Sequence, residues 1–283
     1  KYYGQLMKFR LSATVVFSSA IGYLLGADTV VFIDMCLLLV GGILVTGSAN
    51  GFNQIVERKH DKHMQRTAVR PLPMGNLSVN QALVFTTLIG LIGLYVLSNV
   101  IPGGVKSCLF GLLSIFLYVL VYTPLKRISP IAVFVGAFPG AIPILLGWVA
   151  ATNDFGLAAG ILFAVQFCWQ FPHFIAISWV LDEEYKKAGF KMIYGGEKGK
   201  YPAGIAVMTS ILMTIISTLP FFYNFKDLSL SIYALVLLLI LGIWFTLKAI
   251  KLYQNCDDVT AKQLMLSSFA YLPLMQIIYM LDK

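Results

Sequence analysis

Residues 130–151 read PIAVFVGAFPGAIPILLGWVAA, a stretch of 22 residues without a charged side chain. A helix of about 20 apolar residues crosses the ~30 Å hydrocarbon core of a membrane. Similar runs lie on both sides of this stretch, so we expect nine spans, near 11–27, 30–56, 79–101, 105–123, 130–151, 157–181, 203–223, 229–250 and 262–281. The sequence therefore predicts an all-α, polytopic membrane protein with nine transmembrane helices.

The composition of the whole chain agrees with this prediction. Of 283 residues, 58% are hydrophobic and 12% are charged, about half the roughly 25% charge of a soluble domain. The longest polar stretches, 57–78 and 182–202, are too short for a soluble domain, so we expect residues 1–283 to form a single transmembrane domain. The four cysteines have no metal-binding or disulfide-framework spacing, which predicts that they are apolar fillers. The sequence starts at Lys1 rather than Met, so a short leader is expected to be missing.

The basic residues are distributed unevenly between the two sides of the predicted bundle. Eighteen of the 21 Lys and Arg residues fall on the side of the N-terminus, and Lys106, Lys226 and Lys283 fall on the other. Under the positive-inside rule this asymmetry predicts a multi-pass protein of the cell (inner) membrane with a cytoplasmic N-terminus. The net charge of +8 then reflects topology, and a nucleic-acid partner is excluded because no soluble module carries that charge.

The first polar segment follows the second predicted span. Asn53, Glu57 and Asp61 are spaced i, i+4, i+8, which would place three oxygen donors on one face of a single helix. Such donors suit Mg²⁺ held together with a diphosphate. Arg66 and Arg70 follow at i, i+4 and could grip phosphate oxygens. The alternative is a charged helix end, laced with salt bridges to cations five residues further along the chain.

The second polar segment begins inside the sixth predicted span. Gln166, Gln170 and His173 recur about one turn apart, and polar side chains within a span usually mark a functional cavity. His173 and Glu184 would share a helix face only if the helix continued past Asp182. A structural hydrogen bond is the alternative role for the histidine, and simple solvation or pairing is the alternative for two of the acids at 182–184.

A third polar patch, Tyr122-Thr123-Pro124-Leu125-Lys126-Arg127, is predicted to lie at the same membrane face as the other two. Lys126 and Arg127 add two cations there, and Tyr122 adds a phenol. The alternative is an ordinary positively charged anchor for the preceding span.

The order of these motifs resembles the UbiA superfamily of intramembrane prenyltransferases over essentially the whole chain. The motifs are Asn-x3-Glu-x3-Asp-x2-Met-x-Arg-Thr-x2-Arg-Pro (Asn53 to Pro71), Tyr-Thr-Pro-Leu-Lys-Arg (Tyr122 to Arg127), Gly-Ala-x2-Gly-Ala-x-Pro (Gly136 to Pro143) and Gly147-Trp148. Two later motifs resemble the branch of the superfamily whose acceptor is heme: Trp169-Gln170-x2-His173-Phe174 and Asp182-x2-Tyr185-x2-Ala188-Gly189-x2-Met192.

The resemblance implies nine helices around a central cavity, embedded in a lipid bilayer. It also implies transfer of the farnesyl group of farnesyl diphosphate to a vinyl group of heme b, which yields heme O and diphosphate. Contact with a heme A synthase or a terminal oxidase is left open.

For the site, the resemblance implies Mg²⁺ between the diphosphate and two acidic motifs. The expected metal-binding residues are Asn53, Glu57, Asp61 and Asp182, although which acid of 182–184 meets the second metal stays open. The expected diphosphate-binding cations are Arg66, Arg70, Lys126 and Arg127. His173 would ligate heme iron, hold a propionate or orient water, and ligation is the first expectation because imidazole is a common axial ligand.

Two other functions are compatible with parts of the pattern. A UbiA-type enzyme with an aromatic quinone-precursor acceptor would share the first motif, but normally has more aspartates in the second. A transporter would be expected to show inverted repeats and helices broken at the midplane, whereas the polar groups here gather at one face. Diphosphate release that depends on Mg²⁺ would separate an enzyme from a transporter.

Overall fold

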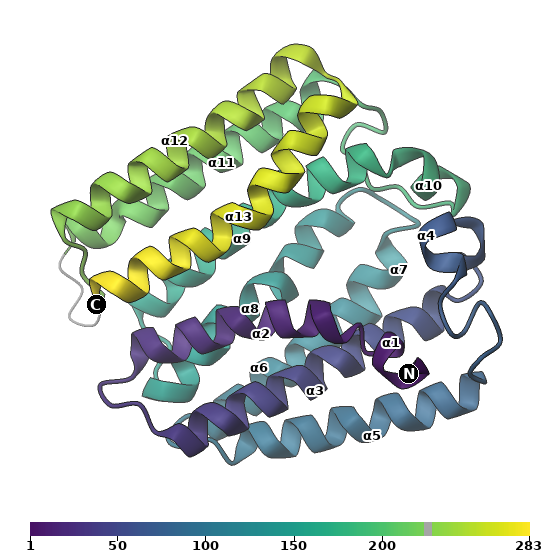
Figure 1. Ribbon diagram of the computed structural model, residues 1–283, viewed down its shortest axis with the longest axis horizontal. Coiled ribbons are helices and arrows are strands. Elements are labelled where there is room, and N and C mark those ends of the chain that lie inside the picture. The colour runs from purple at the N-terminus through teal and green to yellow at the C-terminus, as the bar shows by residue number, and fades with distance from the viewer. Residues whose placement is uncertain (224–227) are drawn as a thin grey trace.

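The computed structural model of the chain describes residues 1–223 and 228–283 and is built of helices (Figure 1). Within that described part, nine helical segments are long and apolar enough to cross a membrane. They are α2 (Phe9–Gly26), α3 (Phe32–Glu57), α5 (Val79–Ser98), the continuous run of α6 (Gly104–Phe116), η2 (Leu117–Tyr122) and α7 (Thr123–Leu125), α8 (Ala132–Thr152), α9 (Leu157–Val180), α11 (Lys200–Phe222), α12 (Ile232–Asn255) and α13 (Asp258–Asp282). The predicted spans are confirmed, and their ends differ from the observed ends by five residues at most. Lys226, one of the three basic residues assigned to the outer side, lies outside the described residues.

The largest difference lies between the last two spans, which are longer than hydropathy predicts. Helix α12 continues past Lys248 and Lys251 because long basic side chains can reach polar surroundings from a helix that remains in the apolar layer. Helix α13 begins early because the Asp257 carboxylate accepts a hydrogen bond from the backbone N–H of Thr260 over 2.7 Å. This N-cap satisfies a donor that the helix end would leave unpaired.

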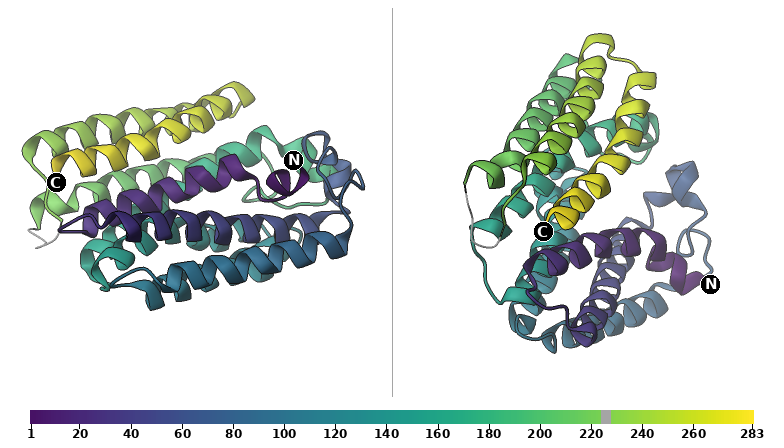
Figure 2. Two further views of the ribbon diagram at one scale, coloured as in Figure 1. Left: turned by 60° about the horizontal axis from the view of Figure 1, so that its bottom comes forward. Right: turned by 60° about the vertical axis from the view of Figure 1, so that its left-hand side comes forward.

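Helices α8 and α9 form the centre of the bundle. In the most apolar windows of these two spans, 78% and 67% of residues are buried, against 44% or less in the other seven spans of the described chain. Helix α8 packs on α2, α6 and α9, whereas α9 packs on α8, α11 and α13. Figures 1 and 2 show α11, α12 and α13 together on one side, with α2, α3 and α5 on the other.

Small residues let α2 and α8 pack with their backbones in contact. A Cβ atom on Gly147 would lie 1.9 Å from the backbone oxygen of Ser19, and one on Gly22 would lie 2.1 Å from that of Ile144. Any larger side chain at these two glycines would force the helices apart. Close approach through small residues is a common way for membrane helices to associate, since lipid offers no hydrophobic driving force between them.

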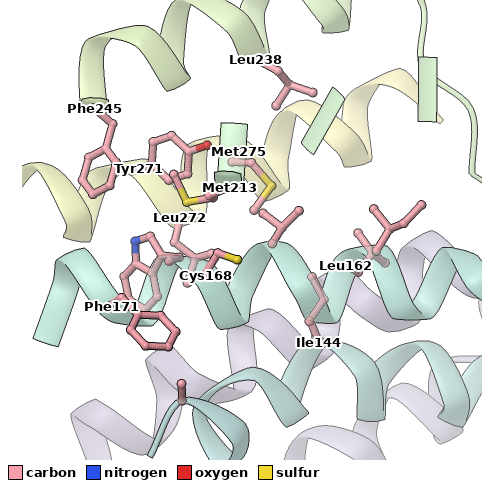
Figure 3. Close-up of a cluster of buried hydrophobic side chains, with 14 of the residues drawn as sticks. Ile144, Leu162, Cys168, Phe171, Met213, Leu238, Phe245, Tyr271, Leu272 and Met275 are labelled. Atoms are coloured by element: carbon pink, nitrogen blue, oxygen red, sulfur yellow. The ribbon is translucent and has the colours of Figure 1, made fainter. Parts of the chain in front are cut away.

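On the other face of the centre, α9 packs against α11–α13 through a large apolar cluster (Figure 3). Cys168 is 6% exposed and lies within this cluster. All four cysteines are free, and Cys36, Cys108 and Cys256 are partly exposed. The cluster shown in Figure 3 includes Ile144, Leu162, Cys168, Phe171, Met213, Leu238, Phe245, Tyr271, Leu272 and Met275.

The three polar segments meet at the end of the bundle that carries the N-terminus (Figure 1). The short helices α1 (Tyr2–Leu6), η1 (Asp61–His63), α4 (Gln65–Ala68) and α10 (Asp182–Lys187) lie there. His60 Nδ1 donates to the backbone oxygen of Ala188 over 3.1 Å, which joins the first segment to the second. The backbone N–H of Lys191 donates to the carbonyl of Lys126 over 2.6 Å, which joins the second to the third.

Candidate active site

The helix that carries Asn53 and Glu57 does not continue to Asp61. Helix α3 ends at Glu57, and Asp61 opens the separate turn η1, so the prediction of one continuous helix face through Asn53, Glu57 and Asp61 is wrong. The end is stabilised by the Arg58 side chain, which folds back and donates to the carbonyl of Ile55 over 2.7 Å. Such a bond satisfies a helix-end carbonyl that has no intrahelical partner.

Glu57 forms an ion pair with Lys126, which follows α7. The two side chains are 7% and 11% exposed, so the pair is almost fully withdrawn from water. The Lys126 ammonium also lies 5.0 Å from the ring centre of Tyr122 and 5.1 Å from that of Phe190. Burial is the largest single influence and lowers the pKa of Lys126, but Glu57, Tyr118 and Tyr185 together raise it by more, and the net pKa lies above the ordinary value. The ammonium is therefore held charged.

Asp61 is paired with Arg70, and its side chain is fully buried. Arg70 Nη1 donates to both carboxylate oxygens, over 2.8 and 2.7 Å. Burial raises the pKa of Asp61, and the attraction of Arg70 only partly offsets that rise. Helix α4 ends at Ala68, so Arg66 lies in this helix and Arg70 beyond it, and Arg66 is exposed. A further positive charge near such an acid would lower its pKa and favour the ionised carboxylate.

Asn53 lies beside a cation that the sequence analysis did not include in the site. Its Oδ1 is 3.5 Å from Lys8 Nζ, and its Nδ2 donates to the Thr123 hydroxyl over 3.1 Å. Lys8 has φ of 49°, a left-handed backbone that is rare for a lysine and brings its side chain to this place. Burial, followed by repulsion from Arg70 and Lys126, lowers the pKa of Lys8 to about 7. A single lysine near the start of a chain carries no spacing signal that would have revealed this role.

A π-helical turn, η2, shapes the third segment. Such turns are rare and frequently occur at functional sites. In this one the Thr123 hydroxyl donates to the carbonyl of Tyr118 over 2.7 Å, and the Tyr118 and Tyr122 rings lie 5.3 Å apart. Gly136 of α8 leaves room for Tyr122, because a Cβ there would lie 2.8 Å from the ring. The turn therefore presents two phenol rings beside the buried ions.

The second acidic motif is arranged differently from the first. Helix α9 ends at Val180 and α10 starts at Asp182, so the helix is broken there and the condition for a shared face of His173 and Glu184 is not met. Asp182 is buried and pairs with the exposed Lys186 over 2.7 Å. Tyr185 of the same helix reaches the first motif: burial raises its pKa, while the charges of Lys126 and Arg66 act to lower it.

Three further residues of the predicted polar segments, Arg127, His173 and Gln166, lie in different surroundings. Arg127 is exposed, like Arg66, and shows no ion pair within the described residues. His173 is buried in α9, where its Nδ1 lies 2.8 Å from the hydroxyl of Ser268 in α13. Gln166 donates to the carbonyl of Gly140 over 2.8 Å, so this glutamine ties α9 to α8.

The donor chemistry fits Mg²⁺ that arrives together with a phosphate ligand. Asn53, Glu57 and Asp61 are 2%, 5% and 0% exposed, and all three carry oxygen donors that face cations. Within residues 1–223 and 228–283, no three His, Cys, Asp or Glu side chains gather at metal-binding distance, so Asp182 is not joined to the other two acids in one cluster. Magnesium commonly uses one or two carboxylates and completes its shell with water and substrate phosphates.

Proteins of known name are similar to this chain over most of its length. Protoheme IX farnesyltransferase of Flavobacterium psychrophilum is 47% identical over 282 residues, covering 99% of this chain and 93% of the relative. The protein of the same name from Cytophaga hutchinsonii is 43% identical, covering 99% of this chain and 97% of the relative. Many other proteins are also similar, and those of the same name include a mitochondrial one from Arabidopsis thaliana, 38% identical over 75% of this chain and 49% of its own length.

Solved structures share the fold. A structure from work on digeranylgeranylglyceryl phosphate synthase superposes with a TM-score of 0.82 at 21% identity, covering 100% of this chain and 97% of the other. A UbiA homologue from Archaeoglobus fulgidus bound to DMAPP and Mg²⁺ gives a TM-score of 0.74 at 14% identity, covering 99% of each chain. The sequence profile described as the UbiA prenyltransferase family matches residues 15–272. This chain belongs to the UbiA prenyltransferase family.

Proposed function

We propose that the chain transfers the farnesyl group of farnesyl diphosphate to a vinyl group of heme b, giving heme O and diphosphate. The names of the relatives at 42–47% identity support this choice of donor and acceptor. The observation that carries the chemistry is a pair of buried ion pairs, Glu57–Lys126 and Asp61–Arg70, at the polar end of an apolar bundle. Together they offer acids for a metal and cations for a diphosphate within a place that excludes water.

The proposed residues divide into two groups. Asn53, Glu57 and Asp61 would hold one Mg²⁺ and Asp182 would meet a second, and the metal when bound supplies positive charge at the diphosphate. Arg70 and Lys126 would bind the diphosphate directly, because both already lie among the acids, and the exposed Arg66 and Arg127 would complete its binding from the outside. Lys8 joins this group on its position beside Asn53.

The reaction breaks the C–O bond between the farnesyl group and diphosphate and forms a C–C bond to the vinyl carbon. The cations stabilise the charge that develops on the departing diphosphate. The allylic cation that remains would face aromatic rings, among them Tyr118, Tyr122 and Phe174, of which the last two lie 6.4 Å apart. These rings stabilise positive charge and keep bulk water away. Water then adds to the acceptor, which completes the hydroxyethyl group with loss of a proton.

The charge distribution supports a proposal for the side of the membrane on which the site lies. The described basic residues assigned to the outer side, Lys106 and Lys283, each donate to backbone carbonyls at helix ends remote in sequence from the three motifs. The site would then lie at the cytoplasmic face of the cell membrane. This position suits farnesyl diphosphate, because its polar diphosphate can stay in water while its apolar farnesyl chain enters the lipid layer. A single domain spanning residues 1–283 would carry the whole reaction.

Product analysis tests the function. Purified protein in detergent is incubated with heme b, farnesyl diphosphate and Mg²⁺, and the mass of the heme product is measured by mass spectrometry. We expect the mass of heme increased by one farnesyl group and one hydroxyl group, and no product after chelation of divalent metal. Farnesylation of an aromatic quinone precursor with heme left unchanged would overturn the acceptor and keep the enzyme class.

A further inference from the structure

The His173 ring is held in a fixed orientation by three aromatic neighbours. Trp169, one turn earlier in α9, stacks on it with ring centres 4.3 Å apart and an angle of 19° between the planes. Phe269 of α13 meets it edge-on at 5.2 Å, and Phe174 meets it edge-on at 5.5 Å. Packing therefore determines the plane of the ring. It does not determine which ring nitrogen carries the proton.

The hydrogen bonds of the Ser268 hydroxyl determine which nitrogen of His173 is protonated. Ser268 Oγ lies 2.6 Å from the carbonyl oxygen of Met265 and 2.8 Å from His173 Nδ1. A hydroxyl has one proton to donate, and a carbonyl oxygen can only accept. If the proton pointed to His173, two oxygens would face each other at 2.6 Å with no proton between them. The Ser268 proton therefore goes to Met265, and its oxygen accepts from His173.

The assignment fixes the tautomer of the histidine. Because Ser268 Oγ accepts, His173 Nδ1 must carry the ring proton, and Nε2 is left with a lone pair. In the described part of the chain, Nε2 makes no hydrogen bond, and the residue keeps 9% of its surface exposed. The serine is itself anchored, since the Trp169 indole N–H donates to the Ser268 carbonyl over 3.0 Å. Helices α9 and α13 thus cooperate to present one basic nitrogen.

We propose that Ser268 is a positioning residue, which holds His173 in the Nδ1–H tautomer so that Nε2 can ligate the iron of the heme substrate. The proposal rests on the proposed function and deepens it by stating how the acceptor is held. An imidazole that donates its other N–H to a protein acceptor is the usual arrangement in metal ligation, because that bond orients the ring and raises its basicity. A heme anchored by its iron has its vinyl groups at a fixed distance and direction from the ligand.

The chain offers a matched control on the same helix. Ser267 is also buried, and its hydroxyl donates to the Gln263 carbonyl over 2.8 Å without contacting His173. Ser268→Ala removes the acceptor for Nδ1, Ser268→Thr keeps a hydroxyl at the same place, and Ser267→Ala removes a comparable hydroxyl elsewhere. General effects of losing a buried serine on α13 would appear in both alanine variants.

The first measurement is the tautomer in the protein without heme. The chain has three histidines, so ¹⁵N labelling of histidine gives a simple spectrum, and the His173 signals are those lost in His173→Gln. We expect a protonated Nδ1 and an unprotonated Nε2 in the wild type, in Ser268→Thr and in Ser267→Ala, but not in Ser268→Ala. A protonated Nε2 in the wild type would overturn the proposal, and this result needs no variant of Ser268 to fold.

The second measurement is a titration with heme followed by the Soret band. We expect Ser268→Ala to bind heme about 10-fold more weakly or worse, His173→Ala to lose the spectral shift, and the threonine and Ser267→Ala variants to match the wild type. Equal affinity of Ser268→Ala and wild type would overturn the positioning role, and an unchanged Soret shift in His173→Ala would overturn ligation. Failure of the proposed function is seen separately, as the absence of farnesylated heme with the wild type.

Discussion

A single nitrogen of Arg70 donates to both carboxylate oxygens of Asp61, over 2.8 and 2.7 Å, in a place where the acid has no exposed surface. Burial raises the pKa of this acid even with the guanidinium beside it. The attraction of Arg70 therefore does not fully offset the burial of the Asp61 carboxylate. A metal ion brought by a diphosphate would supply further positive charge. Arg70 could then turn to the phosphate oxygens, because its own side chain keeps 16% of its surface exposed.

Asp61→Asn tests this role of the carboxylate. The amide keeps the size of the side chain and one oxygen for Arg70 but loses the charge that a metal requires. We expect turnover at saturating Mg²⁺ and both substrates to fall by about 100-fold or more, with little loss of thermal stability in detergent. Turnover close to the wild-type value would remove Asp61 from the metal site.

The Glu57–Lys126 pair should contribute to folding as well as to catalysis. Lys126→Met leaves Glu57 buried and uncompensated, and removal of one partner of a buried pair costs about 3–5 kcal/mol. The double variant Glu57→Gln with Lys126→Met has no such charge and should recover most of that stability, although turnover stays low. Thermal unfolding in detergent measures both. A double variant no more stable than Lys126→Met would show that the pair is not coupled.

Hydropathy was sufficient for the fold because each span is specified by its own residues. The end of α3 was not predictable in the same way. The i, i+4, i+8 spacing suggested a helix through Asp61, whereas the Arg58 side chain satisfies a carbonyl near Glu57 and the helix stops there. A cap of this kind depends on where one flexible side chain folds, and its residue type gives no periodic signal.

The ion pairs of the site could not be predicted for a related reason. The alternative interpretation expected local pairs along the first segment, but Glu57 pairs with Lys126 in another segment and Asp61 pairs with Arg70 beyond α4. Partners from distant segments are chosen by how the helices pack. Lys8 shows the same limit, because its place beside Asn53 depends on a left-handed backbone at the start of α2.

Gly136→Ala tests the position of the Tyr122 ring, one of the aromatic rings proposed to face the allylic cation. The alanine methyl group would lie 2.8 Å from the Tyr122 ring, so the ring must move. This movement would also disturb the contact between the ring and the Lys126 ammonium. Small displacements of positioned groups are expensive in catalysis, so we expect turnover to fall about 10-fold or more. Gly160→Ala in α9 is the control, because a Cβ there meets no atom within 4 Å. It should keep full activity and gain about 0.5–1 kcal/mol of stability from the helix propensity of alanine. Equal turnover of the two variants would exclude Tyr122 from this role.

The orientation of the chain in the membrane gives the last prediction. Lys62 lies in η1 of the first segment and is exposed, whereas Lys106 is exposed beside Asn153, to whose carbonyl it donates over 2.5 Å. Eighteen of the 21 basic residues, Lys62 among them, are assigned to the same side, and translocation of that many cations would oppose the membrane potential. In a variant without the four native cysteines, we expect Lys62→Cys to react with a membrane-impermeant maleimide only in inverted vesicles. Lys106→Cys should react only in intact spheroplasts. The reverse pattern would place the buried ion pairs on the outer face, away from a cytoplasmic supply of diphosphate, and would overturn both the topology and the proposed route of the substrate.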